Sequence, residues 1–440
     1  MAKLKLITFG CQANEADSEK IAGVLAQEGF ELTETAEEAD LILFNTCSIR
    51  EKAEQKVYSL LGTFQKLKAH NPRLKIGLCG CLAQREGARL KERFPYLDLV
   101  AGPGAMIYRI PEILNGVTAE PVLPRPKEPI PLYAHSPRPR RESTFKAWVS
   151  IMEGCNYMCT FCVVPYTRGP ERSRPPQDIL IEVEELLRQG YKEITLLGQT
   201  VNSYGKNLKP RTRFSDLLRA IDDLTGGGIR VRFTSSHPKD MTPDLIEVIS
   251  TLRSVCEHVH LPVQAGSDRV LQRMRRLYTR GEYLEKIWAL REAIPDIALS
   301  TDLIVGFPGE SEEDFRETLS LMREVRYDSL FAFKYSPRPL TPAVEYPDQV
   351  PDKVKTERIN VLLKLQDDIA LEQNRRRRGN IEEVLIEEGP NPRMGSSATG
   401  RTRRNQLVHF SKESLTSGDR VYSIITDGYS HYLKGQLSQR

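Results

Sequence analysis

The chain has 440 residues, a formal net charge of +4 and a hydrophobic content of 40%, which suits a globular protein of two to four domains. No apolar run reaches the roughly 18 residues of a membrane helix, and the charged start "MAKLKLITFG" is too short for a signal peptide. We therefore expect a cytoplasmic protein without membrane contact or structural disulfides, so its eight cysteines point to metal or redox chemistry.

The first 118 residues predict an α/β domain. Buried strands are expected at 3–10, 39–45 and 74–79, and helical patterns follow them at about 16–29, 50–69 and 84–94. Such alternation is typical of an open parallel sheet. Residues 119–144 hold seven prolines without any helical or strand period, and we interpret them as a linker.

Residues 145–375 predict a second α/β domain. Its candidate strands are 146–152, 193–198, 229–235, 258–263, 297–307 and 328–335. A closed barrel of the common kind needs eight strand–helix units, so six predict a partial (β/α)6 barrel with its active face at the carboxyl ends of the strands. A helix is expected over 350–378, and the short β-like runs of 379–440 predict a small all-β barrel.

Three cysteines crowd the loop "EGCNYMCTFCVVP" after the first predicted barrel strand. Cys155, Cys159 and Cys162 have the spacing Cys-x3-Cys-x2-Cys. Thiolates favour iron–sulfur clusters or zinc, but a structural zinc site usually has four ligands. Three cysteines without a local fourth fit a four-iron cluster whose remaining iron is open to a ligand. The alternatives are a zinc loop or a chance cluster.

Three further cysteines follow separate strands of the first domain. Cys11, Cys47 and Cys81 each come shortly after a predicted strand, so they converge on one edge of the sheet if those strands are neighbours. They then predict a second cluster of the same kind; the alternative is three ordinary buried cysteines. Cys79 is assigned to strand packing, and Cys256, in a stretch with a helical pattern, to the core.

These motifs resemble a known family. The triad 155/159/162 and the six-unit barrel resemble the radical S-adenosylmethionine superfamily, and "GCQANEADSE", "NTCSIREKAE" and "GCLAQ" are similar to the N-terminal signature of its methylthiotransferases. The resemblance covers nearly the whole chain. It implies an auxiliary 4Fe-4S cluster on Cys11, Cys47 and Cys81, a radical-generating 4Fe-4S cluster on the other triad, and S-adenosyl-L-methionine as cofactor. One departure is "RMRRLYTR", where the family commonly has "MNRGYT"-like residues.

The run after Cys47 is most similar to the tRNA branch of that family. This implies methylthiolation of C2 of N6-isopentenyladenosine at position 37, with one S-adenosylmethionine methylating a sulfur and a second cleaved to a radical. Alternatives are methylthiolation of threonylcarbamoyl-adenosine or of a ribosomal-protein aspartate and, in another class, a non-catalytic iron–sulfur RNA-binding protein. The implied partners are the tRNA anticodon stem-loop, an electron donor of flavodoxin or ferredoxin type, and iron–sulfur assembly or sulfur carrier proteins. We expect a monomer and assign no catalytic side chain.

Polar side chains at the predicted strand ends are candidates for binding S-adenosylmethionine. Arg174 is expected to meet its carboxylate; turn chemistry is the alternative for the others. His237, His258 and His260 are interpreted as structural. The candidate set is Arg174, Gln199, Asn202, Ser235, Ser236, Gln264 and Ser267.

Basic clusters suggest where RNA binds. The last segment resembles the TRAM domain, a small RNA-binding barrel, and its arginines suit phosphates. Phe331, Phe333 and Tyr335 are weighed as base-stacking residues against ordinary core aromatics. The basic candidates are Arg375 to Arg378, Arg401, Arg403 and Arg404, with linker residues Arg138, Arg140 and Arg141.

Overall fold

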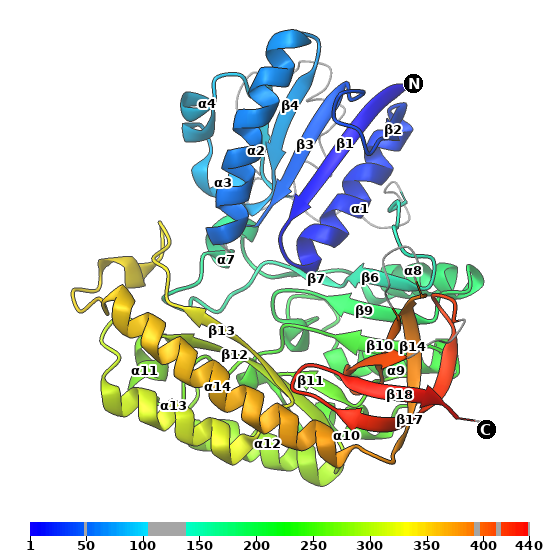
Figure 1. Ribbon diagram of the computed structural model, residues 1–440, viewed down its shortest axis with the longest axis vertical. Coiled ribbons are helices and arrows are strands. Elements are labelled where there is room, and N and C mark those ends of the chain that lie inside the picture. The colour runs from blue at the N-terminus through cyan, green and yellow to red at the C-terminus, as the bar shows by residue number, and fades with distance from the viewer. Residues whose placement is uncertain (48–50, 104–137, 391–396, 411–414, 439–440) are drawn as a thin grey trace.

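A computed structural model describes residues 1–47, 51–103, 138–390, 397–410 and 415–438. Figure 1 shows an N-terminal α/β domain above a larger α/β barrel, with a small β-barrel packed low against its side. The proline-rich residues up to 137, where most of the predicted linker falls, lie outside the described residues. No helix among the described residues combines the length and apolar character needed to cross a membrane.

The N-terminal domain is a parallel sheet of five strands in the order β2-β1-β3-β4-β5. Helices pack on both faces, so β3 is buried along its whole length. The short strands β2 and β5 were not predicted from the sequence. The elements are β1 (Ala2–Phe9), α1 (Gln12–Gln27), β2 (Phe30–Leu32), β3 (Leu41–Thr46), α2 (Glu51–His70), β4 (Lys75–Cys79), α3 (Cys81–Glu86), α4 (Arg89–Arg93) and β5 (Leu99–Ala101).

The central domain has the six predicted strands, arranged as β6-β9-β10 and β11-β12-β13, with every pair parallel. An isolated bridge between Val231 and Val255 links the two groups. The edge strands β6 and β13 are not paired with each other, so the barrel is partial, as predicted. The strands are β6 (Lys146–Ser150), β9 (Glu193–Leu197), β10 (Arg230–Phe233), β11 (His258–His260), β12 (Ala298–Val305) and β13 (Ser329–Lys334).

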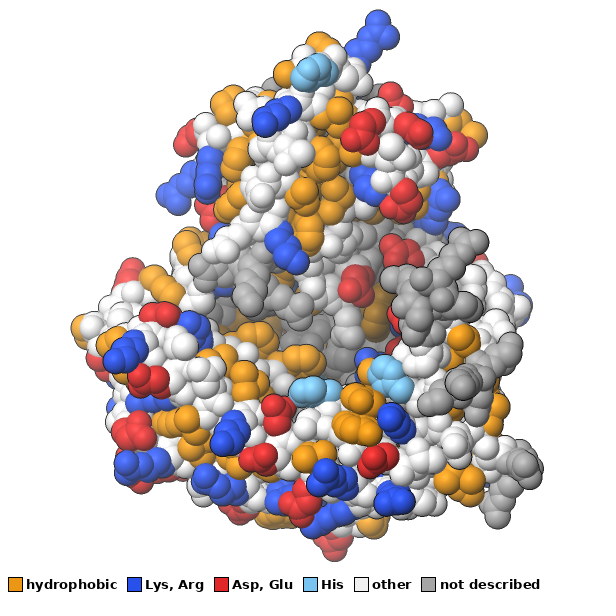
Figure 2. Space-filling model, viewed as in Figure 1, with side chains coloured by type: hydrophobic (Ala, Val, Ile, Leu, Met, Phe, Trp, Pro, Cys, Tyr) orange, Lys and Arg blue, Asp and Glu red, His pale blue; other side chains and the backbone are white. Residues whose placement is uncertain are grey.

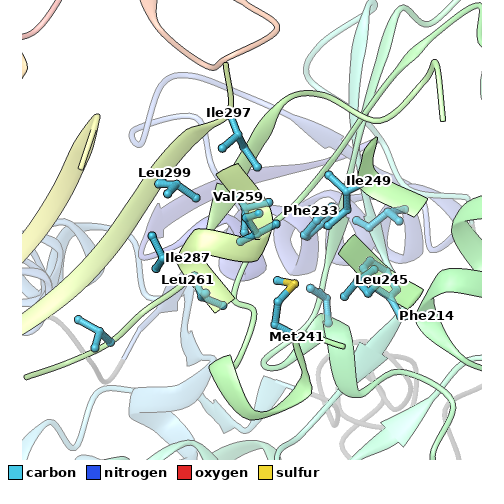
Figure 3. Close-up of a cluster of buried hydrophobic side chains, with 14 of the residues drawn as sticks. Phe214, Phe233, Met241, Leu245, Ile249, Val259, Leu261, Ile287, Ile297 and Leu299 are labelled. Carbon is cyan, nitrogen blue, oxygen red and sulfur yellow. The ribbon is translucent and has the colours of Figure 1, made fainter. Parts of the chain in front are cut away.

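Helices cover the outside of this barrel and seal its core. Phe214 and Leu245 from two helices meet Phe233 and Val259 from two strands (Figure 3). The remaining elements are β7 (Met152–Glu153), α7 (Val164–Arg168), β8 (Arg172–Ser173), α8 (Pro176–Arg188), η2 (Val201–Ser203), α9 (Phe214–Thr225), η3 (Pro238–Asp240), α10 (Pro243–Thr251), α11 (Asp268–Arg273), α12 (Arg280–Ala293), α13 (Glu312–Val325), η4 (Pro342–Glu345) and α14 (Asp352–Arg376).

The C-terminal segment closes into a five-stranded barrel in the order β14-β15-β16-β18-β17. Its interior is apolar, with Val384, Val408 and Phe410 fully buried. The fold class predicted from the sequence is thereby confirmed in all three parts. The strands are β14 (Ile381–Glu388), β15 (Ala398–Thr402), β16 (Leu407–Phe410), β17 (Arg420–Gly428) and β18 (Leu433–Leu437).

Arginines dock this small barrel onto the amino end of the large one. Arg403 bonds Glu257, which precedes β11, and Arg404 pairs with Asp296 and Asp328, which precede β12 and β13. In return, Arg232 of β10 donates to the carbonyls of residues 402 and 403. Arg403 and Arg404 are therefore interface residues, which corrects their interpretation as an RNA-binding cluster.

Two smaller expectations also need correction. Cys256 lies in an extended segment after α10, between the bridge at Val255 and β11, and not in a helix, although it is buried as expected. Arg141 does not reach outward for RNA: it is buried between Glu19 of α1 and Glu182 of α8, so it ties the N-terminal domain to the barrel.

Candidate active site

The first cysteine triad stands on one edge of the N-terminal sheet. Cys11 caps the start of α1 after β1, Cys47 follows β3, and Cys81 begins α3 after β4. Because β1, β3 and β4 are neighbours in that order, their carboxyl ends bring the three thiols together. The predicted convergence of the three cysteines required β1, β3 and β4 to be neighbours, and they are.

The contacts within this triad are direct. A hydrogen bond from the Cys47 side chain lowers the pKa of Cys11 to about 5, with a smaller contribution from the cation Arg168. Burial raises the pKa of Cys81, and the charge of Arg168 opposes that effect. A thiol with a lowered pKa, as at Cys11, suits a ligand that takes it as a thiolate.

Buried amides hold the backbone of this edge. The Asn45 side chain donates to the Asn14 carbonyl at 2.8 Å and to Ser18 Oγ at 2.9 Å, which clamps the first turns of α1 to the end of β3. Asn14 Nδ2 donates back to Asn45 Oδ1 at 3.2 Å. The positions of Cys11 and Cys47 are thus fixed by side chains two or three residues away.

The second triad lies on the loop at the mouth of the barrel. The Cys155 amide donates to the Gly169 carbonyl at 3.1 Å, and Cys155 Sγ lies 3.3 Å from Thr200 Oγ1 at the end of β9. The Cys162 amide donates to the Cys159 carbonyl at 3.0 Å, which curls the loop back on itself. Burial raises the pKa of Cys162 to about 12, with Cys159 adding to that effect.

The donor chemistry of both triads fits an iron–sulfur cluster better than a single ion. Among the described residues, no three His, Cys, Asp or Glu side chains gather closely enough to hold one metal ion. In a four-iron cluster each thiolate binds a different iron, so its three cysteines stand farther apart than the ligands of one zinc. Three cysteines in each triad suit that arrangement.

Buried polar atoms around the second triad fit a polar cofactor. Glu171 Oε1, Ser236 Oγ and His237 Nε2 are buried and have no hydrogen-bond partner within the described residues. Tyr157, inside the cysteine loop, stacks on His237 with ring centroids 4.0 Å apart. Unsatisfied groups of this kind are costly unless something binds them, so they mark a place for a ligand.

Five of the seven predicted cofactor residues fall into two groups. Ser235 and Gln264 have φ values of +66° and +76°, a strained conformation that is frequent at ligand sites, and Ser236 is one of the buried unpartnered groups. Gln199 and Asn202 instead hold the loops, since Gln199 accepts from the Gly154 amide at 2.5 Å and Asn202 bonds the His237 backbone twice at 2.8 Å.

Ser267 and Arg174, the other two predicted cofactor residues, have structural roles. Ser267 Oγ donates to Asp314 at 2.6 Å and so joins the end of one loop to α13. The guanidinium of Arg174 is buried between Asp178, at 2.7 Å, and Glu182, at 2.8 Å. Arg174 is therefore a structural cation between the barrel and α8, which corrects its prediction as the partner of a cofactor carboxylate.

Sequence reasoning missed two buried arginines that touch the triads. Arg168, from α7, ion-pairs with Asp17 at 2.7 Å, and its charge acts on Cys81. Arg276 donates to Cys159 Sγ at 3.4 Å. Arg276 lies in the segment "RMRRLYTR" that departs from the family pattern, which was the available signal; nothing in the sequence brings Arg168 to the other domain.

Where this segment departs from the family pattern, two residues adopt a backbone conformation that does not suit them. Arg275 and Leu277 have φ values of +56° and +59°, a left-handed conformation that Asn and Gly adopt easily and that branched or long side chains do not. The family-like Asn and Gly would be relaxed at these two positions. Leu277 is also 58% exposed, so it gains little burial in return.

Aromatic side chains line the open inner face of the barrel. Phe331 and Phe333 of β13 are 54% and 37% exposed, whereas Tyr335 is buried. In the sheet register Phe331 lies beside Asp302 and Phe333 beside Ile304. The His260 ring meets Phe331 edge-on at 5.9 Å and pairs with Asp302 at 3.4 Å. Of the three candidate aromatics, two are thus available to a planar ligand.

Known proteins resemble this chain along its length. The family profile described as Uncharacterized protein family UPF0004 matches residues 3–102, and that of the Radical SAM superfamily matches residues 149–322. Proteins named tRNA-2-methylthio-N(6)-dimethylallyladenosine synthase are 49% identical in Desulforamulus reducens (99% of this chain, 96% of that protein) and 49% identical in Carboxydothermus hydrogenoformans (98% of each).

Solved structures show the same fold at much lower identity. A radical S-adenosylmethionine methyltransferase from Kitasatospora setae, with cobalamin and a 4Fe-4S cluster bound, superimposes with a TM-score of 0.57 at 14% identity, over 78% of this chain and 74% of that one. A cobalamin-dependent S-adenosylmethionine radical enzyme gives a TM-score of 0.56 at 15% identity, over 81% and 56%.

Proposed function

The chain belongs to the methylthiotransferase family of radical S-adenosylmethionine enzymes, and from this premise we propose that it methylthiolates C2 of N6-isopentenyladenosine at position 37 of tRNA. Identity of about one half over the full length of relatives with that named activity supports the choice of substrate. The tRNA anticodon stem-loop is then its macromolecular substrate.

One observation carries the proposal: two cysteine triads meet across a pair of adjacent residues. The Gly169 carbonyl accepts from the amide of Cys155 in the second triad, while the side chain of Arg168 ion-pairs with Asp17 of α1 and its charge acts on Cys81 of the first. This supports a scheme in which two cysteine sites from different domains share the barrel mouth. A reaction that needs a radical source and a sulfur source in one chamber fits this arrangement.

In this scheme the side chains of the protein bind the clusters and the cofactor and hold them in position. Cys11, Cys47 and Cys81 would hold an auxiliary 4Fe-4S cluster, and Cys155, Cys159 and Cys162 a second one that coordinates S-adenosylmethionine. When bound, these groups supply the methylthio sulfur and the radical that activates a strong C–H bond. Ser235, Ser236 and Gln264 would bind the cofactor, and the closed N-terminal domain would keep water from the chamber.

The inner face of β13 suits the modified base. Figure 2 shows hydrophobic side chains and histidines gathered where the molecule is hollowed, between the upper domain and the barrel. Phe331 and Phe333 offer exposed rings for stacking and for the apolar isopentenyl group, and the His260–Asp302 pair offers polar contacts beside them. An adenosine with an apolar N6 substituent matches this mixture.

The remaining partners follow from the chemistry. The radical cluster needs a one-electron donor of flavodoxin or ferredoxin type, and the auxiliary cluster needs a supply of sulfur from assembly or carrier proteins. A tRNA substrate places the reaction in the cytoplasm.

The test is anaerobic reconstitution with iron and sulfide, followed by incubation with S-adenosylmethionine, a reductant and an anticodon stem-loop that carries isopentenyladenosine. Mass spectrometry should find the methylthio mark on that nucleoside together with 5′-deoxyadenosine. A mark only on threonylcarbamoyl-adenosine or on a ribosomal protein would assign the chain to another branch. RNA binding without any 5′-deoxyadenosine would make it a non-catalytic iron–sulfur protein.

A further inference from the structure

We propose that each cysteine triad has its own electrostatic regulator: Arg168 sets the reduction potential of the auxiliary cluster, and Arg276 sets that of the radical cluster. This inference rests on the proposed function, because it assumes that both triads hold clusters. Both guanidiniums come from the barrel domain, and both are buried.

Arg168 reaches out of its own domain to the first triad. It ends α7, the short helix that follows the second triad, and its side chain is 8% exposed. Its positive charge acts on the thiols of Cys81 and Cys11. Asp17 of α1, 4% exposed, holds the guanidinium at 2.7 Å. Arg168 and Asp17 therefore form a buried charge pair against the auxiliary site.

Arg276 occupies the equivalent place at the second triad. Its Nη1 donates to Cys159 Sγ at 3.4 Å, its Nη2 to the Pro262 carbonyl at 2.9 Å and its Nε to Tyr278 Oη at 2.8 Å. Its charge also acts on the neighbouring thiol Cys162. Among the described residues Arg276 contacts no carboxylate, so its charge acts on the thiols of the second triad.

A buried cation favours the more negative state of whatever lies beside it. A four-iron cluster with three thiolates gains one negative charge on reduction, and its potential responds to nearby charge and to hydrogen bonds on sulfur. Arg168 and Arg276 should therefore each make their own cluster easier to reduce. Asp17 partly offsets Arg168, so the two potentials can be adjusted separately.

The experiment is a redox titration followed by electron paramagnetic resonance on the full-length reconstituted chain. To isolate the auxiliary cluster, Cys155, Cys159 and Cys162 are replaced by Ala; to isolate the radical cluster, Cys11, Cys47 and Cys81 are. In the first background Arg168→Met should shift the midpoint to a more negative potential, and Asp17→Asn should shift it to a more positive one. Arg276→Met should give a negative shift in the second background.

The opposite signs are the discriminating result, because general damage to the structure would move Arg168→Met and Asp17→Asn in the same direction. Arg168→Lys keeps the charge and should restore most of the potential lost in Arg168→Met. If Arg168→Met loses its iron, Asp17→Asn and Arg276→Met still decide. Unchanged midpoints, equal signs at the first site, or a shift of both clusters by one variant would overturn the proposal. Triple variants that bind no iron even with every arginine intact would instead refute the two-cluster function.

Discussion

Gly80 is the residue that lets Cys81 approach the rest of its triad. Its φ is +91°, and a Cβ there would lie 2.5 Å from Asn45 Oδ1 and 2.7 Å from the Thr46 carbonyl oxygen. These atoms belong to the end of β3, immediately before Cys47. Any side chain at position 80 must therefore push Cys81 away from Cys47 and Cys11.

We expect Gly80→Ala to lose the auxiliary cluster and keep the radical one. Iron and sulfide analysis of the reconstituted variant should give about half of the wild-type content. Formation of 5′-deoxyadenosine should persist while methylthio transfer stops. The matched control is Gly62→Ala on α2, where a Cβ meets nothing within 4 Å. Full iron content in Gly80→Ala would contradict this role.

Leu277 carries backbone strain without burial to offset it. Relieving the left-handed conformation of a non-glycine residue stabilises the folded state by about 1–2 kcal/mol. Glycine also raises the conformational entropy of the unfolded chain, which offsets part of this stabilisation. Leu277→Gly should thus raise the free energy of unfolding by up to about 1 kcal/mol, measured by urea denaturation. Leu224→Gly is the control, since this exposed leucine lies within helix α9 and its replacement should destabilise by a similar amount. A loss of stability in both variants would show that Leu277 is not strained.

At the scale of elements, the strands that carry the site could be predicted and their contacts could not. The runs predicted for β1, β3, β4 and the six barrel strands are each at least six residues long, so each cysteine could be placed at a strand end. The first triad also depends on β1, β3 and β4 being neighbours, and the runs themselves do not reveal the order of strands in the sheet. The arginines of β15 and the turn after it looked like an RNA surface because a basic run has the same composition whether it faces solvent or a buried carboxylate.

Replacing Arg404 tests whether the arginines after β15 dock the small barrel or bind RNA. It is 9% exposed and pairs at 2.8 Å with Asp328, which is equally buried. Burial raises the pKa of Asp328 even with Arg404 opposing that effect. Removing the cation leaves an uncompensated carboxylate, so Arg404→Ala should cost about 3 kcal/mol in thermal or urea unfolding. Arg376→Ala, at a largely exposed pair with Glu372, should change stability by less than about 0.5 kcal/mol. If Arg404→Ala weakened tRNA binding without loss of stability, the RNA interpretation would return.

On the scale of the whole molecule, the barrel is covered at both ends by different domains. The small barrel docks at the amino ends of the strands, and the N-terminal domain lies at their carboxyl ends. The chamber between the triads therefore exists only while the N-terminal domain stays in contact with the barrel. Buried ion pairs make the contact: Asp17 with Arg168, Glu54 with Arg338, and Glu19 with Arg141. Such pairs join residues more than a hundred positions apart, which is why no local pattern in the sequence indicated them.

Glu19 should make this contact sensitive to pH. Burial raises its pKa from the ordinary 4.5 to about 7, although Arg141, 3.2 Å away, opposes the shift. A carboxyl with a raised pKa holds its proton in the folded state where the unfolded chain has lost it. Its contribution to stability is therefore fully present below pH 4.5, and it is lost as the pH rises through about 7.

The measurement is the difference between two pH profiles of unfolding free energy. Between pH 4.5 and 7.5 the wild type should lose up to roughly 3 kcal/mol more than Glu19→Gln, which cannot ionise. Taking the difference cancels every other group that titrates in this window, such as Glu171, whose pKa burial also raises to about 7. Glu31→Gln, at an exposed position of β2, should follow the wild type. Glu19 of α1 is joined to Glu182 of α8 through Arg141. Parallel profiles for wild type and Glu19→Gln would therefore mean that this carboxylate stays ionised at the domain contact and that the contact does not respond to pH through it.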